Sequence, residues 1–142
     1  MTLARNWRFC AINNTGQTLA VTGSDALAIT YRGVKRDGSY QATEQTLSYT
    51  TPDLTNGNAA EFAGVDNSTD QFVGLDGTVT VTATNASADG TIDIYIETST
   101  DGGTTFPSDA PDFVASEDLT WVASLRINSN GAGYQKATNI KI

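Results

Sequence analysis

Carboxylates are the most abundant groups in this chain that could do chemistry. The sequence has 16 Asp and Glu residues, one Cys and no His. The lack of His excludes Ser–His and Cys–His nucleophile systems, and one thiol does not make a zinc site. Two carboxylates alone would serve a glycosidase, and Glu97 with Glu117 is one such pair. Because acids are so frequent, such pairs arise by chance, and Glu97 is expected to be solvated on the outer face of a strand. We therefore predict that the chain has no catalytic residues and is not an enzyme.

Oxygen-rich loops offer a second kind of chemistry, the binding of a hard cation. Asp101, Asp109 and Asp112 follow Glu97 closely, and their carboxylates would suit calcium. The spacing of an EF-hand loop is absent, and no glycine-rich phosphate loop follows a predicted strand. The pattern favours solvated acidic loops, so we predict neither a metal nor a cofactor.

Charge is divided unevenly along the chain. No Lys or Arg occurs from Asp37 to Leu125, whereas every acid except Asp25 lies in that interval, and the net charge is -8. This balance excludes nucleic acid as a partner, because phosphate contacts need clustered Lys and Arg. No apolar run approaches the length of a membrane span, so we expect no membrane contact. An acidic body with basic ends suits docking in a fixed orientation on a charged surface.

Alternating hydrophobicity indicates an all-β fold. Val79 and Val81 share one face of a strand, and Ile92, Ile94 and Ile96 share one face of another. Turn signals such as Asp-Gly and Asn-Gly separate these segments. We predict a single antiparallel β-sandwich domain over residues 1–142, jelly-roll or immunoglobulin-like in topology. A helical turn is expected only at 59–62. The expected strands cover 7–12, 17–21, 27–31, 46–50, 78–84, 91–97, 119–127 (with Leu119, Trp121, Ala123, Leu125 and Ile127 facing inward) and 134–142.

One local motif stands out between residues 99 and 106. Its sequence, Ser-Thr-Asp-Gly-Gly-Thr-Thr-Phe, resembles the Asp-box, a hairpin motif found in sialidase-like propellers and other β proteins. The resemblance implies that the Asp101 side chain caps backbone N–H groups of the turn, and that Ser99 and Thr105 form hydrogen bonds to each other or to the turn backbone. It also implies that Gly103 accepts a positive φ angle and that Phe106 packs beneath the hairpin. A single copy excludes a propeller, so we predict a structural hairpin.

The compartment and the aromatic residues add two further expectations. The start of the chain lacks the hydrophobic core of a signal peptide and the chain has one cysteine, so we expect a protein made in a reducing cytosol. Cys10 lies within a predicted strand and is expected to be buried. Tyr40, Tyr49 and Tyr95 are candidates for a sugar-binding face, although cross-strand packing is the favoured interpretation.

A longer passage, from Gly77 to Pro111, is similar in style to small β-sandwich virion proteins of tailed bacteriophages. In this passage a strand ending in Tyr-Ile-Glu leads into Ser-Thr-Asp-Gly-Gly and then Phe-Pro. The resemblance implies a structural role in the virion, first as a capsid decoration (cement) protein. Its partners would be the major capsid protein or other virion proteins, as a homo-oligomer on a particle assembled in the host cytoplasm. The alternatives are a neck, tail or baseplate component, or a carbohydrate- or surface-binding β-sandwich module.

Two short segments are predicted to contact the particle or a sister subunit. The first combines basic and aromatic residues, a mixture typical of interface hot spots, and the second is a basic turn. A second interpretation makes the two aromatic rings core residues of an edge strand. The predicted interface residues are Arg5, Trp7, Arg8 and Phe9 in the first segment, and Arg32, Lys35 and Arg36 in the second.

Overall fold

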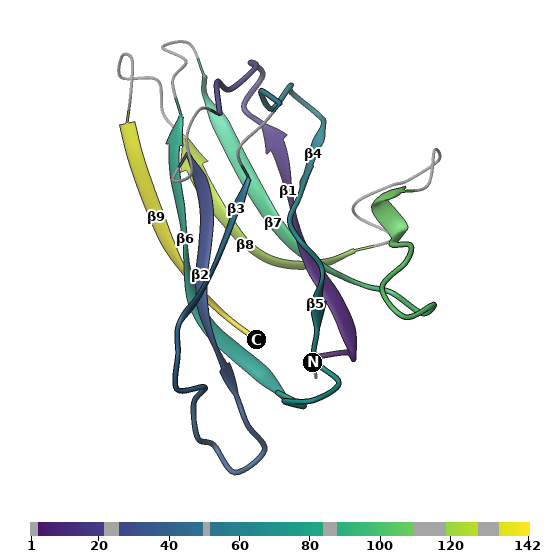
Figure 1. The fold of residues 1–142 in the computed structure, drawn as a ribbon. Coiled ribbons are helices and arrows are strands. Elements are labelled where there is room, and N and C mark those ends of the chain that lie inside the picture. Colours follow the sequence, from purple (N-terminus) through teal and green to yellow (C-terminus); the bar gives the residue numbers. More distant parts are fainter. Residues whose placement is uncertain (1–2, 22–25, 50–51, 84–87, 110–118, 128–133) are drawn as a thin grey trace.

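The chain folds as two antiparallel β-sheets packed face to face in a computed structural model, which confirms the predicted all-β sandwich (Figure 1). The structure describes residues 3–21, 26–49, 52–83, 88–109, 119–127 and 134–142. Asp112 and Glu117, named above as possible chemical groups, lie outside these ranges. No helix in the described part is both long and apolar enough to cross a membrane.

The first sheet has the strand order β4–β1–β7–β8, with β5 pairing to β1 beyond the end of β4. Strand β1 is therefore central in its sheet. Along β7 the three isoleucines of the predicted stripe are buried, as the period-two pattern requires. The strands of this sheet are β1 (Asn6–Asn14), β4 (Ala59–Glu61), β5 (Val65–Asp66), β7 (Gly90–Thr98) and β8 (Thr120–Ile127).

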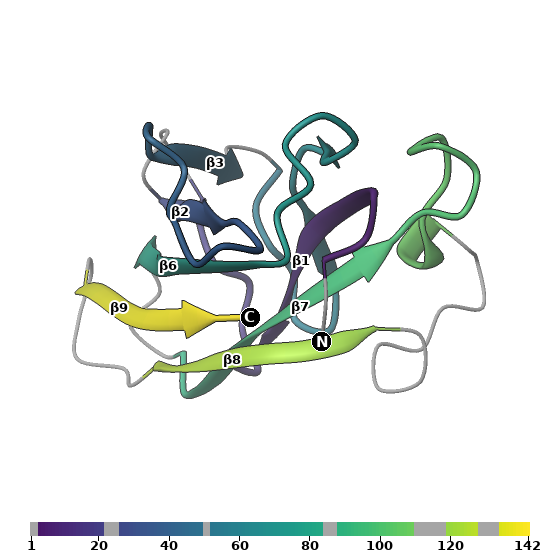
Figure 2. The ribbon, with the colours of Figure 1, turned by 90° about the horizontal axis from the view of Figure 1, so that it is seen from below.

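The second sheet has the order β3–β2–β6–β9, and every pairing in it is antiparallel. Strand β9 also contacts β8 of the first sheet, so the two sheets meet along one side of the sandwich (Figure 2). The strands of this sheet are β2 (Leu27–Val34), β3 (Gln45–Tyr49), β6 (Gly74–Ala83) and β9 (Tyr134–Lys141).

The core lies between the facing sides of the two sheets. Trp7, Phe9 and Tyr31 pack edge to face with ring centroids 5.2 to 6.3 Å apart, which joins β1 of one sheet to β2 of the other. Aromatic pairs prefer such arrangements, because the positive ring edge meets the negative ring face. The isoleucines of β7 and the valines of β6 complete this core.

Two local predictions are wrong. Residues 59–61 form strand β4, which pairs with β1 so that Glu61 lies opposite Cys10, and they do not form a helical turn. The reason is tertiary, because pairing with a central strand outweighs the weak helical preference of two alanines. Over the predicted strand 17–21 no continuous strand forms; Leu19 and Ala20 take part in bridges, and the partner of Leu19 is Leu54.

A β-bulge in β8 corrects a third prediction. Ile94 lies opposite Ala123 whereas the next residue, Tyr95, lies opposite Trp121, so Val122 is an extra residue in the strand. An extra residue shifts the side chains beyond it to the other face of the sheet. Trp121 was expected to face inward, but its side chain is 58% exposed.

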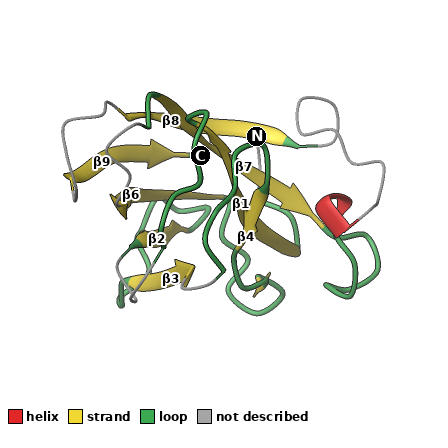
Figure 3. Ribbon diagram, turned by 90° about the horizontal axis from the view of Figure 1, so that it is seen from above, coloured by secondary structure: helices red, strands yellow, loops and turns green. Residues whose placement is uncertain are grey.

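Beyond the end of β7 the chain leaves the sandwich. The hairpin after β7 and the short 3-10 helix η1 (Pro107–Asp109) stand out from the side of the first sheet (Figure 3). The connection from β2 to β3 and the loop from β5 to β6 lie at the same end of the sandwich as the N-terminus (Figure 1).

Candidate functional site

Three of the predicted interface residues line one cavity at the end of the sandwich that carries the N-terminus. Arg5 comes from the segment before β1, and Lys35 and Arg36 come from the turn after β2. The cavity has a volume of about 810 Å³, and apolar side chains including Leu3 and Phe72 also line it. We call this cavity, with its three basic residues, the basic groove.

The loop from 67 to 73 forms one wall of the basic groove and is held rigidly. The Asn67 side chain, which is buried, donates to the carbonyl oxygens of Ala4 (3.3 Å) and Phe72 (2.9 Å) and accepts from the Phe72 N–H (2.8 Å). Gln71 has a φ angle of 52°, the left-handed conformation that side chains other than Gly rarely adopt. The loop is therefore held by hydrogen bonds of Asn67 within the loop and to the segment before β1.

The charges in the basic groove are mixed. Asp37 and Asp70 line it together with the three cations. Among the ion pairs of the described residues none involves Arg5, Lys35 or Arg36, so all three cations remain available to a partner. The groove therefore combines charges of both signs with apolar side chains.

Arg32 is exposed and lines a smaller hollow of about 380 Å³ on the neighbouring part of the same sheet. Tyr40 lies in this hollow and donates its hydroxyl to the Asp76 carboxylate at 2.6 Å. Lys141 lies 3.8 Å from the same carboxylate. Arg32 thus lies close to the basic groove along β2 without lining it.

The structure corrects the interface prediction for Trp7 and Phe9. Their side chains are 1% and 0% exposed, so neither ring can contact a partner in this fold. They belong to the core, and β1 is a central strand, not an edge. Both segments predicted to dock carry basic residues to the groove, but the aromatic residues of the first segment serve folding.

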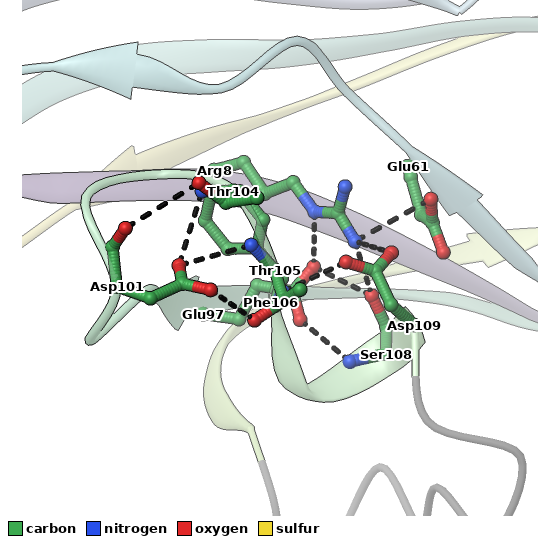
Figure 4. Close-up of polar contacts among 9 residues, drawn as sticks. All are labelled: Arg8, Glu61, Glu97, Asp101, Thr104, Thr105, Phe106, Ser108 and Asp109. Carbon is green, nitrogen blue, oxygen red and sulfur yellow. Dashed lines mark hydrogen bonds and ion pairs between the residues drawn. The ribbon is translucent and has the colours of Figure 1, made fainter.

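The Arg8 side chain is 11% exposed and takes part in an ion-pair network on the outer face of the first sheet (Figure 4). Its Nε donates to Glu97 at 2.5 Å, and its Nη2 donates to Ser108 Oγ and Asp109 Oδ1, both at 2.7 Å. Glu61 lies 3.4 Å away on β4. Burial alone would lower the pKa of Arg8, but the hydrogen bonds to Glu97 and Asp109 raise it. The interface prediction is therefore corrected for Arg8, whose guanidinium ties η1 to the sheet.

Glu97, expected to be solvated, is a buried member of this network. Its side chain is 0% exposed, because η1 and the hairpin cover this part of the outer face. Besides Arg8, it accepts hydrogen bonds from the Ser108 N–H (2.9 Å) and Ser108 Oγ (2.7 Å). A buried carboxylate with three donors is held as a fixed acceptor. This role in packing η1 is one that the sequence did not indicate.

The hairpin from 99 to 106 has the contacts expected for its motif. The Asp101 carboxylate accepts from the backbone N–H groups of Thr104 (3.1 Å) and Thr105 (3.0 Å) and from the Thr105 hydroxyl (2.7 Å). Ser99 Oγ donates to Asp101 and accepts from the Gly103 N–H at 2.8 Å. These hydrogen bonds, first among them the one from Ser99, hold the pKa of Asp101 well below its usual range.

Phe106 connects the hairpin to the ion-pair network. Its side chain is 8% exposed, and the Arg8 guanidinium carbon lies 4.2 Å from the ring centroid (Figure 4). A guanidinium over a ring face gains from the ring quadrupole. The hairpin, η1 and β1 are therefore joined around one half-buried cation, the Arg8 guanidinium.

Asp101 and Asp109, two of the carboxylates considered above for calcium, have other partners. Asp101 caps the hairpin, and Asp109 accepts from Arg8 and from the Phe106 N–H, contacts that lower its pKa. Within the described ranges no group of three or more His, Cys, Asp or Glu residues is placed to hold a metal ion.

Comparison of the chain with protein-family models, with curated proteins and with solved structures found no match in any of the three. The functional interpretation therefore depends on the residues of this chain and on their arrangement.

Proposed function

We propose that this chain is a non-enzymatic structural protein of a tailed-bacteriophage virion, and first a decoration (cement) protein on the outer surface of the head. A neck, tail or baseplate component is the closest alternative. The similarity of the passage from Gly77 to Pro111 to virion proteins supports the proposal, and so does the two-sheet sandwich that contains this passage. In this proposal several copies bind the major capsid protein or other virion proteins during assembly in the host cytoplasm.

The observation that carries the proposal is the gathering of cations without ion-pair partners at one end of an acidic domain. Arg5, Lys35 and Arg36 make no ion pair among the described residues and line one groove, while the chain as a whole has a charge of -8. Such an asymmetric charge distribution orients a protein as it approaches a charged surface and raises the rate of productive encounters. A protein that coats a particle needs this fixed orientation.

The carboxylates of the first sheet also support a structural role. Glu97 and Asp109 fix η1 through Arg8, and Asp101 fixes the hairpin. Each of these groups has hydrogen-bond or ion-pair partners within the fold, and the Glu97 side chain is fully covered. The proposal assigns them to the stability of the domain.

Sedimentation with particles from the native source tests the proposal. We expect the protein to migrate with particles in a density gradient, and we expect purified protein to rebind particles stripped of it. Migration only as a free small protein, together with no rebinding, would contradict a role in the virion.

A pair of single charge reversals tests the docking end. Arg36→Glu changes the basic groove, whereas Arg126→Glu changes an exposed residue that pairs with Asp89 and lies outside the groove. We expect Arg36→Glu to weaken rebinding and to reduce its salt dependence, because rim charges act mainly on association. Equal rebinding by the two variants would contradict docking through the groove.

A further inference from the structure

An exposed tryptophan on the outer face of the first sheet has no role in the core or in the basic groove. Trp121 is 58% exposed, although tryptophan is highly buried on average. The β-bulge at Val122 turns it outward, and bulges commonly re-aim a side chain next to a functional site. Its register partner on β7 is Tyr95, which is half-buried on the same face.

Polar side chains beside Trp121 form a connected chain of hydrogen bonds. The indole Nε1 donates to Ser124 Oγ at 3.2 Å, and Ser124 in turn donates to Asp93. The other Asp93 oxygen accepts from Asn14 Nδ2 at 2.7 Å. We call Trp121, Tyr95, Asp93, Ser124 and Asn14 the outer aromatic face. All five come from the central part of β7, the adjoining part of β8 and the end of β1, so the rigid sheet fixes their positions.

We propose that the outer aromatic face binds a neutral saccharide. The C–H groups of a pyranose ring carry partial positive charge, which is attracted to the negative face of an indole. The hydroxyl groups of the same ring need donors and acceptors in place of water, and Asp93, Ser124 and Asn14 supply both kinds beside the indole. Because the indole is already tied to Ser124, less conformational freedom is lost when a ligand binds.

The surroundings select the class of ligand. Asp93 and the net charge of -8 disfavour sugars that carry carboxylate or sulfate groups. A protein partner is less well matched, because a stable protein interface buries about 800 Å² on each side around an apolar centre. Here one exposed indole and one half-buried phenol are surrounded by polar groups. This site is separate from the basic groove and does not depend on the proposed role in a virion.

Tryptophan fluorescence measures this binding directly. The chain has two tryptophans, and Trp7 is buried, so quenching by acrylamide reports on Trp121. The probes are hexasaccharides of glucose, mannose, xylose and N-acetylglucosamine, with polygalacturonate as the anionic comparison. We expect at least one neutral probe to protect Trp121 from quenching and polygalacturonate to give no protection.

Variants then distinguish a saccharide site from a contact between copies of the chain, with binding followed by calorimetry. Trp121→Ala should lower the affinity by about tenfold or more, the loss expected when a central aromatic contact is removed. The matched control is Tyr40→Ala, because Tyr40 is the other large exposed aromatic residue in the described part of the chain, at 51%, and lies away from this face. Equal affinities of the two variants, or no binding by any probe at millimolar concentration, would overturn the proposal. A dimer in the wild type that Trp121→Ala abolishes would also overturn it, in favour of contact between copies of the chain.

Discussion

Replacement of Arg8 by methionine tests the most unexpected feature of the fold, the buried ion pair with Glu97. Methionine retains an unbranched apolar chain and removes the guanidinium. The Glu97 side chain is 0% exposed and would keep only the two donors of Ser108. Removing one partner of a buried ion pair costs about 3–5 kcal/mol, because the remaining charge is uncompensated. The pairs with Glu61 and Asp109 add little, since those side chains are 39% and 38% exposed.

Urea unfolding followed by the fluorescence of Trp7 measures this loss, with Trp121→Phe as the background so that the buried indole is the reporter. With a urea dependence of about 2 kcal/mol per molar, the midpoint of Arg8→Met should fall by about 2 M. The double variant Arg8→Met/Glu97→Met removes both charges, so its stability should lie within about 1–2 kcal/mol of the background. A loss below about 1 kcal/mol for Arg8→Met, or no coupling between the two sites, would refute the reasoning.

Three further predictions concern single residues. Gly90→Ala should cost more than about 2 kcal/mol in urea unfolding, because φ is +151° and a Cβ would lie 2.2 Å from a backbone carbonyl oxygen. Gly57→Ala, at φ +81° in open space, should cost about 1 kcal/mol, and equal costs would contradict the steric argument. Burial raises the pKa of the Cys10 thiol to about 12. The native protein should therefore not react with a disulfide reagent at about pH 8, whereas the unfolded protein should react fully. Rapid reaction of the native protein would contradict the burial of this thiol. The hydrogen bond from Ser99 lowers the pKa of Asp101 in the folded state. The contribution of Asp101 to stability is therefore present above the ordinary pKa of about 4, and it is lost as the pH falls through the pKa of the folded state. Asp101→Ala should therefore lose less stability than the wild type between about pH 5 and pH 2, and identical losses would contradict the capping role.

The strands that could be predicted are those whose information is local. Alternation in β6 and β7 places Val79, Val81 and the three isoleucines on buried faces, as expected. The capping of the hairpin by Asp101 is equally local, because donor and acceptor lie within four residues of each other. Hydrogen bonds between residues this close in sequence depend on the backbone of one segment, so they can be predicted from the sequence of that segment.

The outward turn of Trp121 could not be predicted from β8 alone. The apolar stripe of 119–127 is regular in sequence, and the extra residue at Val122 exists only relative to the register of β7. The sequence of one strand does not specify how its partner aligns with it. The candidate saccharide site is therefore a product of strand pairing.

The division of charge was evident in the sequence, but its arrangement was not. Composition alone predicts that phosphate groups are not the partner, and local spacing alone predicts a sheet protein with a capped hairpin. Only the packed sandwich decided that Arg5 meets Lys35 and Arg36 in a groove, and that Arg8 is withdrawn to neutralise Glu97, which is 89 residues away in the chain. The physical reason is that burial decides the role of a charge. A carboxylate covered by η1 must take a cation from the nearest strand, while the same kind of cation at the open end of the sandwich stays available to a partner.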